Sequence, residues 1–199
     1  MNTLIIVGEQ DAGAYEQALS GSGLAVAAFP CADWNRDLSP WPAEKAFKKG
    51  EPFAGEAAAY LNTLLAFSTE WERSLPEPID KRYLAGYSLA GLFSLWALYE
   101  TERFDGAVSA SGSLWYPGWL DFISKNHPKR PARFSLSLGD KEVHTKNPVM
   151  ARVGDATRET CRLLDAQGYP VAFAWNEGGH FADEASRVVR AVRALLELG

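Results

Sequence analysis

The stretch Lys81–Gly91 reads KRYLAGYSLAG and decides the fold. A short apolar run, Tyr83–Ala85, leads into Gly86-Tyr87-Ser88-Leu89-Ala90, and the apolar segment Leu92–Tyr99 follows. This order predicts a strand, a tight turn and a helix, with Ser88 at the apex of the turn. The pattern G-x-S-x-small is typical of a nucleophile elbow, in which a strained backbone pushes a serine side chain clear of a sheet.

The two small residues of the motif have a physical role, because the strand and helix backbones of an elbow pass close to each other. Gly86 and Ala90 meet this requirement, and alanine in the second position is a mild departure from glycine. An isolated match is also typical of a strand, turn and helix that merely contain a serine. The interpretation therefore depends on the rest of the chain.

A serine hydroxyl needs a base to take its proton and an acid to hold that base, and in this architecture they follow in the order nucleophile, acid, base. His180 comes after the apolar run Val171–Trp175 and a Gly-Gly turn, so we predict it as the base. His127 lies in a polar connector, which is typical of a solvated loop residue. His144 fits either a surface position or a neighbour of the acid.

The acid is predicted in the turn after another strand. Phe134, Leu136 and Leu138 alternate with polar residues, Gly139 ends the run, and Asp140 and Glu142 follow. The spacing G-x-x-D/E from Gly139 favours Glu142. Asp140 is the alternative acid, or it caps the turn through its side chain.

Further site residues are predicted from position. The backbone N–H groups of Leu89 and of Glu9 or Gln10, in the loop after the first strand, are the expected donors of an oxyanion hole. Two tryptophan-rich loops and the elbow are expected to supply the substrate pocket: Trp34, Asn35, Arg36, Trp41, Tyr87, Trp115 and Tyr116. The alternative for each of these aromatic side chains is that it only covers the core.

Composition excludes several classes of protein. The net charge is −5, and Lys45, Lys48 and Lys49 form no convincing basic patch, so we expect no nucleic-acid partner. Cys31 and Cys161 are the only cysteines, and they imply neither a disulfide framework nor a metal site. No apolar run approaches the ~20 residues of a membrane span, and the N-terminus lacks the features of a signal peptide. We therefore expect no membrane partner and a cytoplasmic location.

Strands and helices alternate along the 199 residues, which predicts a single α/β domain over residues 1–199. About six strands should form a mostly parallel sheet with helices on both faces. The loop Cys31–Lys45 is expected to be long and without regular structure. On the last helix, an apolar stripe should face the sheet while Arg187, Arg190 and Arg193 face water.

Three segments carry a resemblance to a known family. GYSLAGLFSLWALYETERFDGAVSASGSLWYPG, SLGDKE and GGHF resemble the esterase branch of the α/β-hydrolases that includes enterochelin-esterase-like and esterase-D-like enzymes. The resemblance implies a compact α/β-hydrolase core, here without a separate lid domain, and ester hydrolysis through an acyl-serine with no metal or organic cofactor. It matches Ser88 to the nucleophile and His180 to the base. The chain is shorter than typical members, so siderophore cleavage is not transferred to it.

The sequence therefore predicts a serine esterase that acts on a small soluble carboxylic ester. Two alternatives remain at this point. The same three side chains can support acyl transfer or thioester cleavage. A hydrolase fold can also be catalytically silent and serve only in binding.

Overall fold

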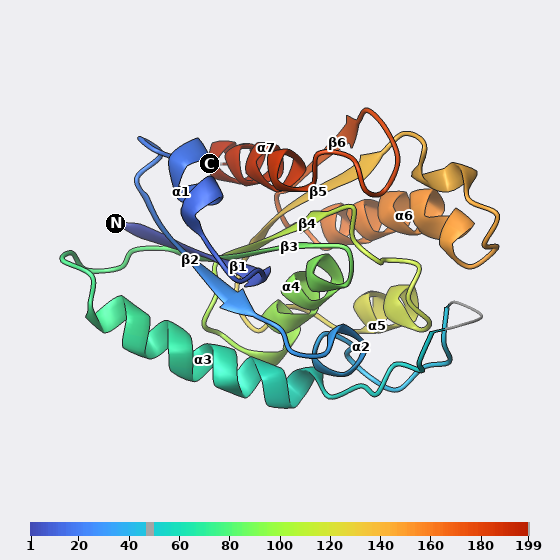
Figure 1. Cartoon of the computed structure of the whole chain (residues 1–199), viewed down its shortest axis with the longest axis horizontal. Coiled ribbons are helices and arrows are strands. Elements are labelled where there is room, and N and C mark those ends of the chain that lie inside the picture. Colours follow the sequence, from blue (N-terminus) through green and yellow to red (C-terminus); the bar gives the residue numbers. More distant parts are fainter. Residues whose placement is uncertain (47–49, 199) are drawn as a thin grey trace.

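The computed structural model describes residues 1–46 and 50–198; Lys48 and Lys49 of the lysine group considered above lie outside these ranges. Its centre is one six-stranded sheet with the strand order β2-β1-β3-β4-β5-β6 (Figure 1). Every neighbouring pair in this sheet is parallel. The strands are β1 (Asn2–Gly8), β2 (Leu24–Pro30), β3 (Arg82–Tyr87), β4 (Gly106–Ala110), β5 (Arg133–Gly139) and β6 (Val171–Asn176).

Helices connect the strands, as a parallel sheet requires. They are α1 (Gly13–Ala18), α2 (Trp34–Asp37), α3 (Ala57–Arg73), α4 (Leu89–Glu100), α5 (Trp119–Lys125), α6 (Val153–Ala166) and α7 (Glu184–Glu197), with short 3₁₀ helices η1 (Glu142–His144) and η2 (Met150–Arg152).

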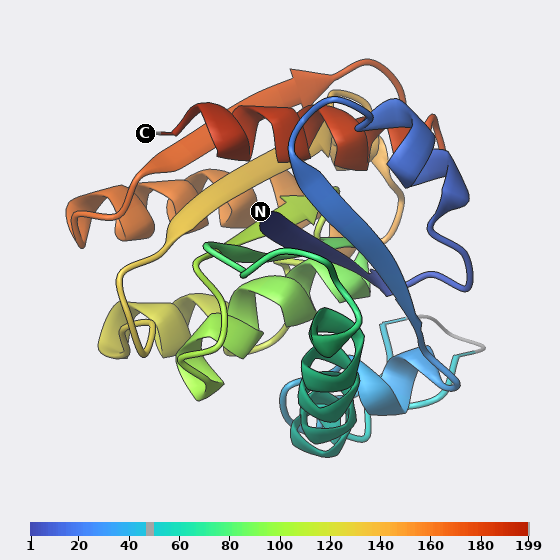
Figure 2. The ribbon, with the colours of Figure 1, turned by 90° about the vertical axis from the view of Figure 1, so that its left-hand side faces the viewer.

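The sheet is covered on both faces, and Figure 2 shows it between two layers of helices. Strand β1 illustrates why, since Leu4 and Ile6 pack into the apolar cluster beneath α1 and α7. Ile5 and Val7 point the other way, into the cluster that contains α3, α4 and α5. A strand buried on both sides reads as a continuous apolar run, as β1 does.

The connections reverse direction between β1 and β3. From β1 the chain passes outward to β2, and it then returns through α3 to β3, on the other side of β1. Ligands of open parallel sheets bind beyond the carboxyl ends of the strands at such a reversal. Ser88 follows the last residue of β3 and so lies at this place.

The predicted α/β class and parallel sheet are confirmed, but one loop differs from expectation. The segment Cys31–Lys45 contains the short helix α2. Its start is stabilised by Asp33, whose carboxylate accepts a hydrogen bond from the backbone N–H of Arg36. The helix is a single turn, too short to give the apolar periodicity from which longer helices are predicted.

Within residues 1–46 and 50–198, no helix is both long and apolar enough to span a membrane. The same residues contain no cluster of three or more His, Cys, Asp or Glu side chains arranged to hold a metal ion.

Candidate active site

Ser88 occupies a strained turn between β3 and α4. Its backbone has φ of 55° and ψ of −122°, a conformation that a non-glycine residue adopts only under constraint. The constraint comes from close packing, since a Cβ atom at Gly86 would overlap the carbonyl of Ala90. The geometry is that of the elbow predicted from the motif.

Three side chains from distant parts of the chain meet at this turn. The Oγ of Ser88 lies 3.1 Å from Nε2 of His180. The Nδ1 of His180 lies 2.7 Å from Oε2 of Glu142. Both distances are those of hydrogen bonds, so serine, imidazole and carboxylate form one connected line.

The Glu142 carboxylate is buried, with only 4% of its side chain exposed. Burial opposes its ionisation, but hydrogen bonds from His180, Ser111 and the backbone N–H of Gly139 outweigh that cost and hold its pKa below the usual value. The Gly139 N–H lies 2.8 Å from Oε1. Glu142 is therefore ionised at neutral pH and able to accept a hydrogen bond from a ring N–H of His180.

Asp140, the alternative acid, lies in a different arrangement. Its Oδ1 accepts a hydrogen bond of 2.8 Å from the backbone N–H of Gly178. This contact ties the turn after β5 to the loop that carries His180. Asp140 thus links the two loops, whereas Glu142 is the carboxylate in contact with the imidazole.

Arg187 departs most clearly from the sequence prediction. It was expected to face water, but it is completely buried. Helical periodicity describes only how α7 packs on the sheet, and here the loop carrying His180 folds over the first turn of the helix. The guanidinium lies 3.0 Å from Oε1 of Glu142.

Two serines after β4 also belong to the site, although sequence reasoning assigned them no role. Ser111 has a positive φ of 48°, and its Oγ accepts a hydrogen bond from Arg187. The Oγ of Ser113 lies 3.4 Å from Oγ of Ser88, and its N–H donates to the carbonyl oxygen of Ser88. The sequence signal for these two serines is the segment Ser-Gly-Ser-Leu-Trp-Tyr at residues 111–116, which is part of the family resemblance.

A cavity of about 620 Å³ opens at Ser88 and His180. Of the residues predicted for the pocket or oxyanion hole, Trp34, Asn35, Trp115 and Leu89 line it. Further lining side chains were not predicted: Phe53, Ser111, Ser113, Lys141, His144, Thr145, Met150, Val153 and Phe181. Four of these nine come from the segment between β5 and α6, which the sequence did not place over the site.

Four residues predicted for the pocket do not line this cavity. Trp41 and Tyr116 hold two loops together instead, since the Tyr116 hydroxyl donates to the carbonyl of Trp41 at 2.6 Å and the Trp41 indole donates to Pro117 at 2.7 Å. Arg36 is paired with Asp37 at 2.7 Å. Tyr87 lies behind the imidazole, where its hydroxyl donates to the backbone carbonyl of His180.

Glu9 and Gln10, the predicted second oxyanion donors, lie in the loop after β1. Neither Glu9 nor Gln10 lines the cavity. Glu9 turns toward α1, where its carboxylate accepts a hydrogen bond from the Tyr15 hydroxyl at 3.1 Å. At Gly8 the space on the cavity side is taken by the indole of Trp34.

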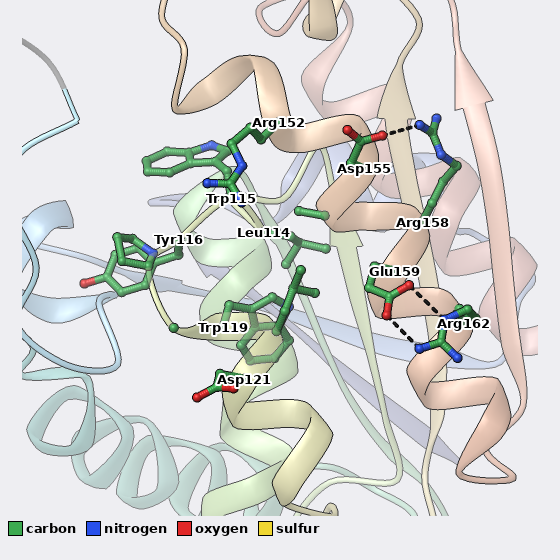
Figure 3. Close-up of a pocket in the computed structure, with 14 residues that line it drawn as sticks. Leu114, Trp115, Tyr116, Trp119, Asp121, Arg152, Asp155, Arg158, Glu159 and Arg162 are labelled. Atoms are coloured by element: carbon green, nitrogen blue, oxygen red, sulfur yellow. Dashed lines mark hydrogen bonds and ion pairs between the residues drawn. The ribbon is translucent and has the colours of Figure 1, made fainter.

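A second cavity, of about 760 Å³, lies between α5 and α6 and shares Trp115 with the first (Figure 3). Its charged side chains are largely paired along α6. Arg158 contacts Asp155 at 2.6 Å, and Arg162 contacts Glu159 at 2.7 Å. Because these charges compensate each other at the surface, the cavity offers a ligand little net attraction.

The sequence matches no protein-family model and no curated protein, but the structure resembles solved ones. Siderophore hydrolase EstA from Aspergillus nidulans superimposes with a TM-score of 0.77 at 19% identity, over 100% of this chain and 83% of that one. An IroE-like serine hydrolase from Shewanella oneidensis superimposes with a TM-score of 0.76 at 17% identity, over 98% of this chain and 70% of that one. This chain has the α/β-hydrolase fold. Enterobactin esterase FES from Shigella flexneri superimposes with a TM-score of 0.68 at 18% identity, over 99% of this chain and 52% of that one.

Proposed function

We propose that this chain is a serine esterase that cleaves small carboxylic esters through an acyl-Ser88 intermediate. The observation that carries the proposal is the connected line from Ser88 to His180 to Glu142, with distances of 3.1 and 2.7 Å. The names of its structural relatives, which include hydrolases and esterases, support the same class of reaction.

In the first half of the reaction, Oγ of Ser88 attacks the ester carbonyl carbon and gives its proton to Nε2 of His180. The carbonyl oxygen becomes an oxyanion. When the tetrahedral intermediate collapses, the bond between carbon and the alcohol oxygen breaks, and His180 returns the proton to the departing alcohol. The acyl group remains on Ser88.

In the second half, a water molecule takes the place of the alcohol. His180 removes a proton from the water as it attacks the acyl carbon, and then returns that proton to Oγ of Ser88 as the acid leaves. Throughout, Glu142 accepts a hydrogen bond from the Nδ1–H group of His180. This bond fixes the imidazole tautomer in which Nε2 is free to accept a proton.

Leu89 is proposed to stabilise the oxyanion. It is the first residue of α4 and lines the cavity beside Ser88. A backbone N–H at this position has no acceptor within its own helix, and it lies at the positive end of the helix dipole. The developing negative oxygen can therefore receive its hydrogen bond.

The cavity walls favour a substrate with an apolar part. Trp34, Phe53, Trp115, Met150 and Phe181 provide apolar surface around the proposed nucleophile. Burying apolar area is worth roughly 25 cal/mol per Å², so these walls can bind an acyl or alcohol group without a specific polar contact. A small-molecule ester is the proposed substrate.

The test is hydrolysis of p-nitrophenyl esters of graded acyl length, by the wild type and by Ser88→Ala and His180→Gln. We expect turnover by the wild type, and loss of that turnover in both variants. Adding an alcohol or thiol acceptor distinguishes hydrolysis from acyl transfer, because transfer would consume the acceptor. Ligand binding without turnover of any ester would indicate a binding protein and would overturn the proposal.

A further inference from the structure

Arg187 is an unusual residue for its position. It lies in the first turn of α7, where a cation opposes the helix dipole. It is also completely buried, and burial of a charge is costly unless the charge is well paired. Because both features are unfavourable, the contacts of the guanidinium must compensate for them.

One nitrogen of the guanidinium holds the acid. Nη1 donates to Oε1 of Glu142 at 3.0 Å, which leaves Oε2 of the same carboxylate for His180. Nη1 also lies 2.9 Å from Oγ of Ser111 and 3.3 Å from the Tyr87 hydroxyl. The carboxylate is therefore held on the side opposite the imidazole.

The other nitrogen holds the loop that carries the base. Nη2 donates to the backbone carbonyls of Glu177 at 2.8 Å and Gly179 at 2.9 Å. Gly179 immediately precedes His180. The space is tight, since a Cβ atom at Gly139 would collide with both the Gly178 carbonyl and the guanidinium.

We propose that Arg187 is a positioning residue, whose planar guanidinium joins the Glu142 carboxylate to the His180 loop and so sets the distance between acid and base. This inference rests on the proposed function. A rigid fork can contact both partners at once, whereas the single ammonium of lysine is a compact point charge. Arg187 does not line the cavity, so it acts only through Glu142 and His180.

The charge of Arg187 has a separate consequence. It compensates the negative charge of Glu142, which a neutral replacement would leave unbalanced next to His180. Glu142 and Tyr87 contact the guanidinium directly, and the His180 imidazole lies on the far side of the Glu142 carboxylate. The adjoining segments contribute further titratable groups, whose side chains form no hydrogen bond or ion pair with the guanidinium: Glu9, Tyr15, Asp140, Lys141, Glu177, Asp183 and Glu184.

The test compares Arg187→Lys and Arg187→Met with Arg190→Lys and Arg190→Met. Arg190 is a matched control, because it lies about one turn further along α7 and contacts Asn176 instead of Glu142 or the His180 loop. Both Arg187 variants should lose about 100-fold in kcat with little change in KM, since small displacements of reacting groups cost about that much. The acid limb of the pH profile should move to higher pH in Arg187→Met only, because lysine keeps the charge.

Folding is checked by circular dichroism and thermal unfolding. If Arg187→Met does not fold, the comparison of kcat is made with Arg187→Lys alone. Nitrogen-15 NMR of labelled histidine then reports the tautomer of His180 without any substrate, and three histidines are few enough to assign by substitution. We expect the His180 signals to shift in the Arg187 variants and to stay unchanged in the controls.

Folded Arg187 variants with wild-type kcat, pH profile and His180 signals would overturn the inference. An inactive wild type would instead overturn the proposed function. The NMR comparison would still decide whether Arg187 holds His180 in place.

Discussion

Oε2 of Glu142 lies 2.7 Å from Nδ1 of His180, although the two residues are 38 positions apart in the chain. The contact joins the turn after β5 to the loop after β6, which are neighbouring strands. Because the strands are parallel, both turns lie at the same edge of the sheet, next to Ser88. The contact selects Glu142 rather than Asp140 as the proposed acid, and it leads to the first prediction.

Replacing Glu142 by glutamine should lower kcat by about three orders of magnitude. A neutral amide cannot stabilise the imidazolium that forms in the reaction and does not enforce the required tautomer. Asp140→Asn is the matched control, since an amide oxygen can still accept the Gly178 N–H, and its kcat should stay within a few-fold of the wild type. The opposite result, measured by steady-state kinetics, would transfer the role of the acid to Asp140.

The ionisation of Glu142 should make the stability of the fold depend on pH. Its pKa is lowered in the folded protein, so its contribution to stability is complete above the usual value of 4.5 and is lost as the pH falls through the folded pKa. Glu142→Gln lacks this contribution and also leaves Arg187 without its charged partner, which costs about 3 kcal/mol at neutral pH.

Chemical denaturation of both proteins from about pH 7 to about pH 3 measures this difference. The gap in unfolding free energy between wild type and Glu142→Gln should narrow as the pH falls. A gap that stays constant over that range would show that Glu142 is not the titrating group.

The tryptophans of the cavity should control substrate preference. Trp34→Ala and Trp115→Ala remove apolar wall on the two sides of the site, so we expect kcat/KM for long-chain esters to fall by roughly 10-fold and that for acetate esters to change less. Trp71→Ala is the control, because Trp71 stacks on Phe67 in α3, away from the cavity. Equal losses for all ester lengths would argue against a role in binding the acyl group.

The two cysteines should be chemically inert. Burial raises the pKa of Cys31 to about 12, with a further contribution from Asp37, and burial raises that of Cys161 to about 12 as well. Very little thiolate is then present near pH 8, and iodoacetamide should neither label the folded protein rapidly nor inhibit it. Mass spectrometry after timed exposure measures the labelling, with the unfolded protein as the positive control. Rapid inactivation with alkylation of Cys31 would contradict this prediction.

The fold was predictable because its signals are local. Apolar runs such as Thr3–Val7 give strands, and the motif around Ser88 fixes one strand, one turn and one helix in sequence. Once a parallel sheet is inferred, the ends of its strands share an edge. Ser88 and His180 are therefore expected at the same edge, although β4 and β5 lie between their strands and the loop after β6 has to fold back to bring them into contact.

The unpredicted part of the site depends on how loops fold over the edge of the sheet, and hydrophobic periodicity does not describe loops. Arg187 occupies a polar position of the α7 pattern, and it is buried because it reaches Ser111 and Glu142 at the edge of the sheet while the His180 loop covers it. Trp41 and Tyr116 were predicted in the pocket, yet each bonds to the other's loop. Composition identified the loops near the site but not the direction in which each side chain points.

The central claim is that Ser88 is a nucleophile activated by His180, and covalent labelling tests it most directly. The protein is treated with a fluorophosphonate probe, digested, and the modified residue is located by mass spectrometry. We predict a single adduct on Ser88 of the folded wild type, a greatly slowed reaction in His180→Gln, and no adduct in Ser88→Ala. A folded wild type that remains unlabelled, or an equal extent of labelling in Ser88→Ala, would contradict the account.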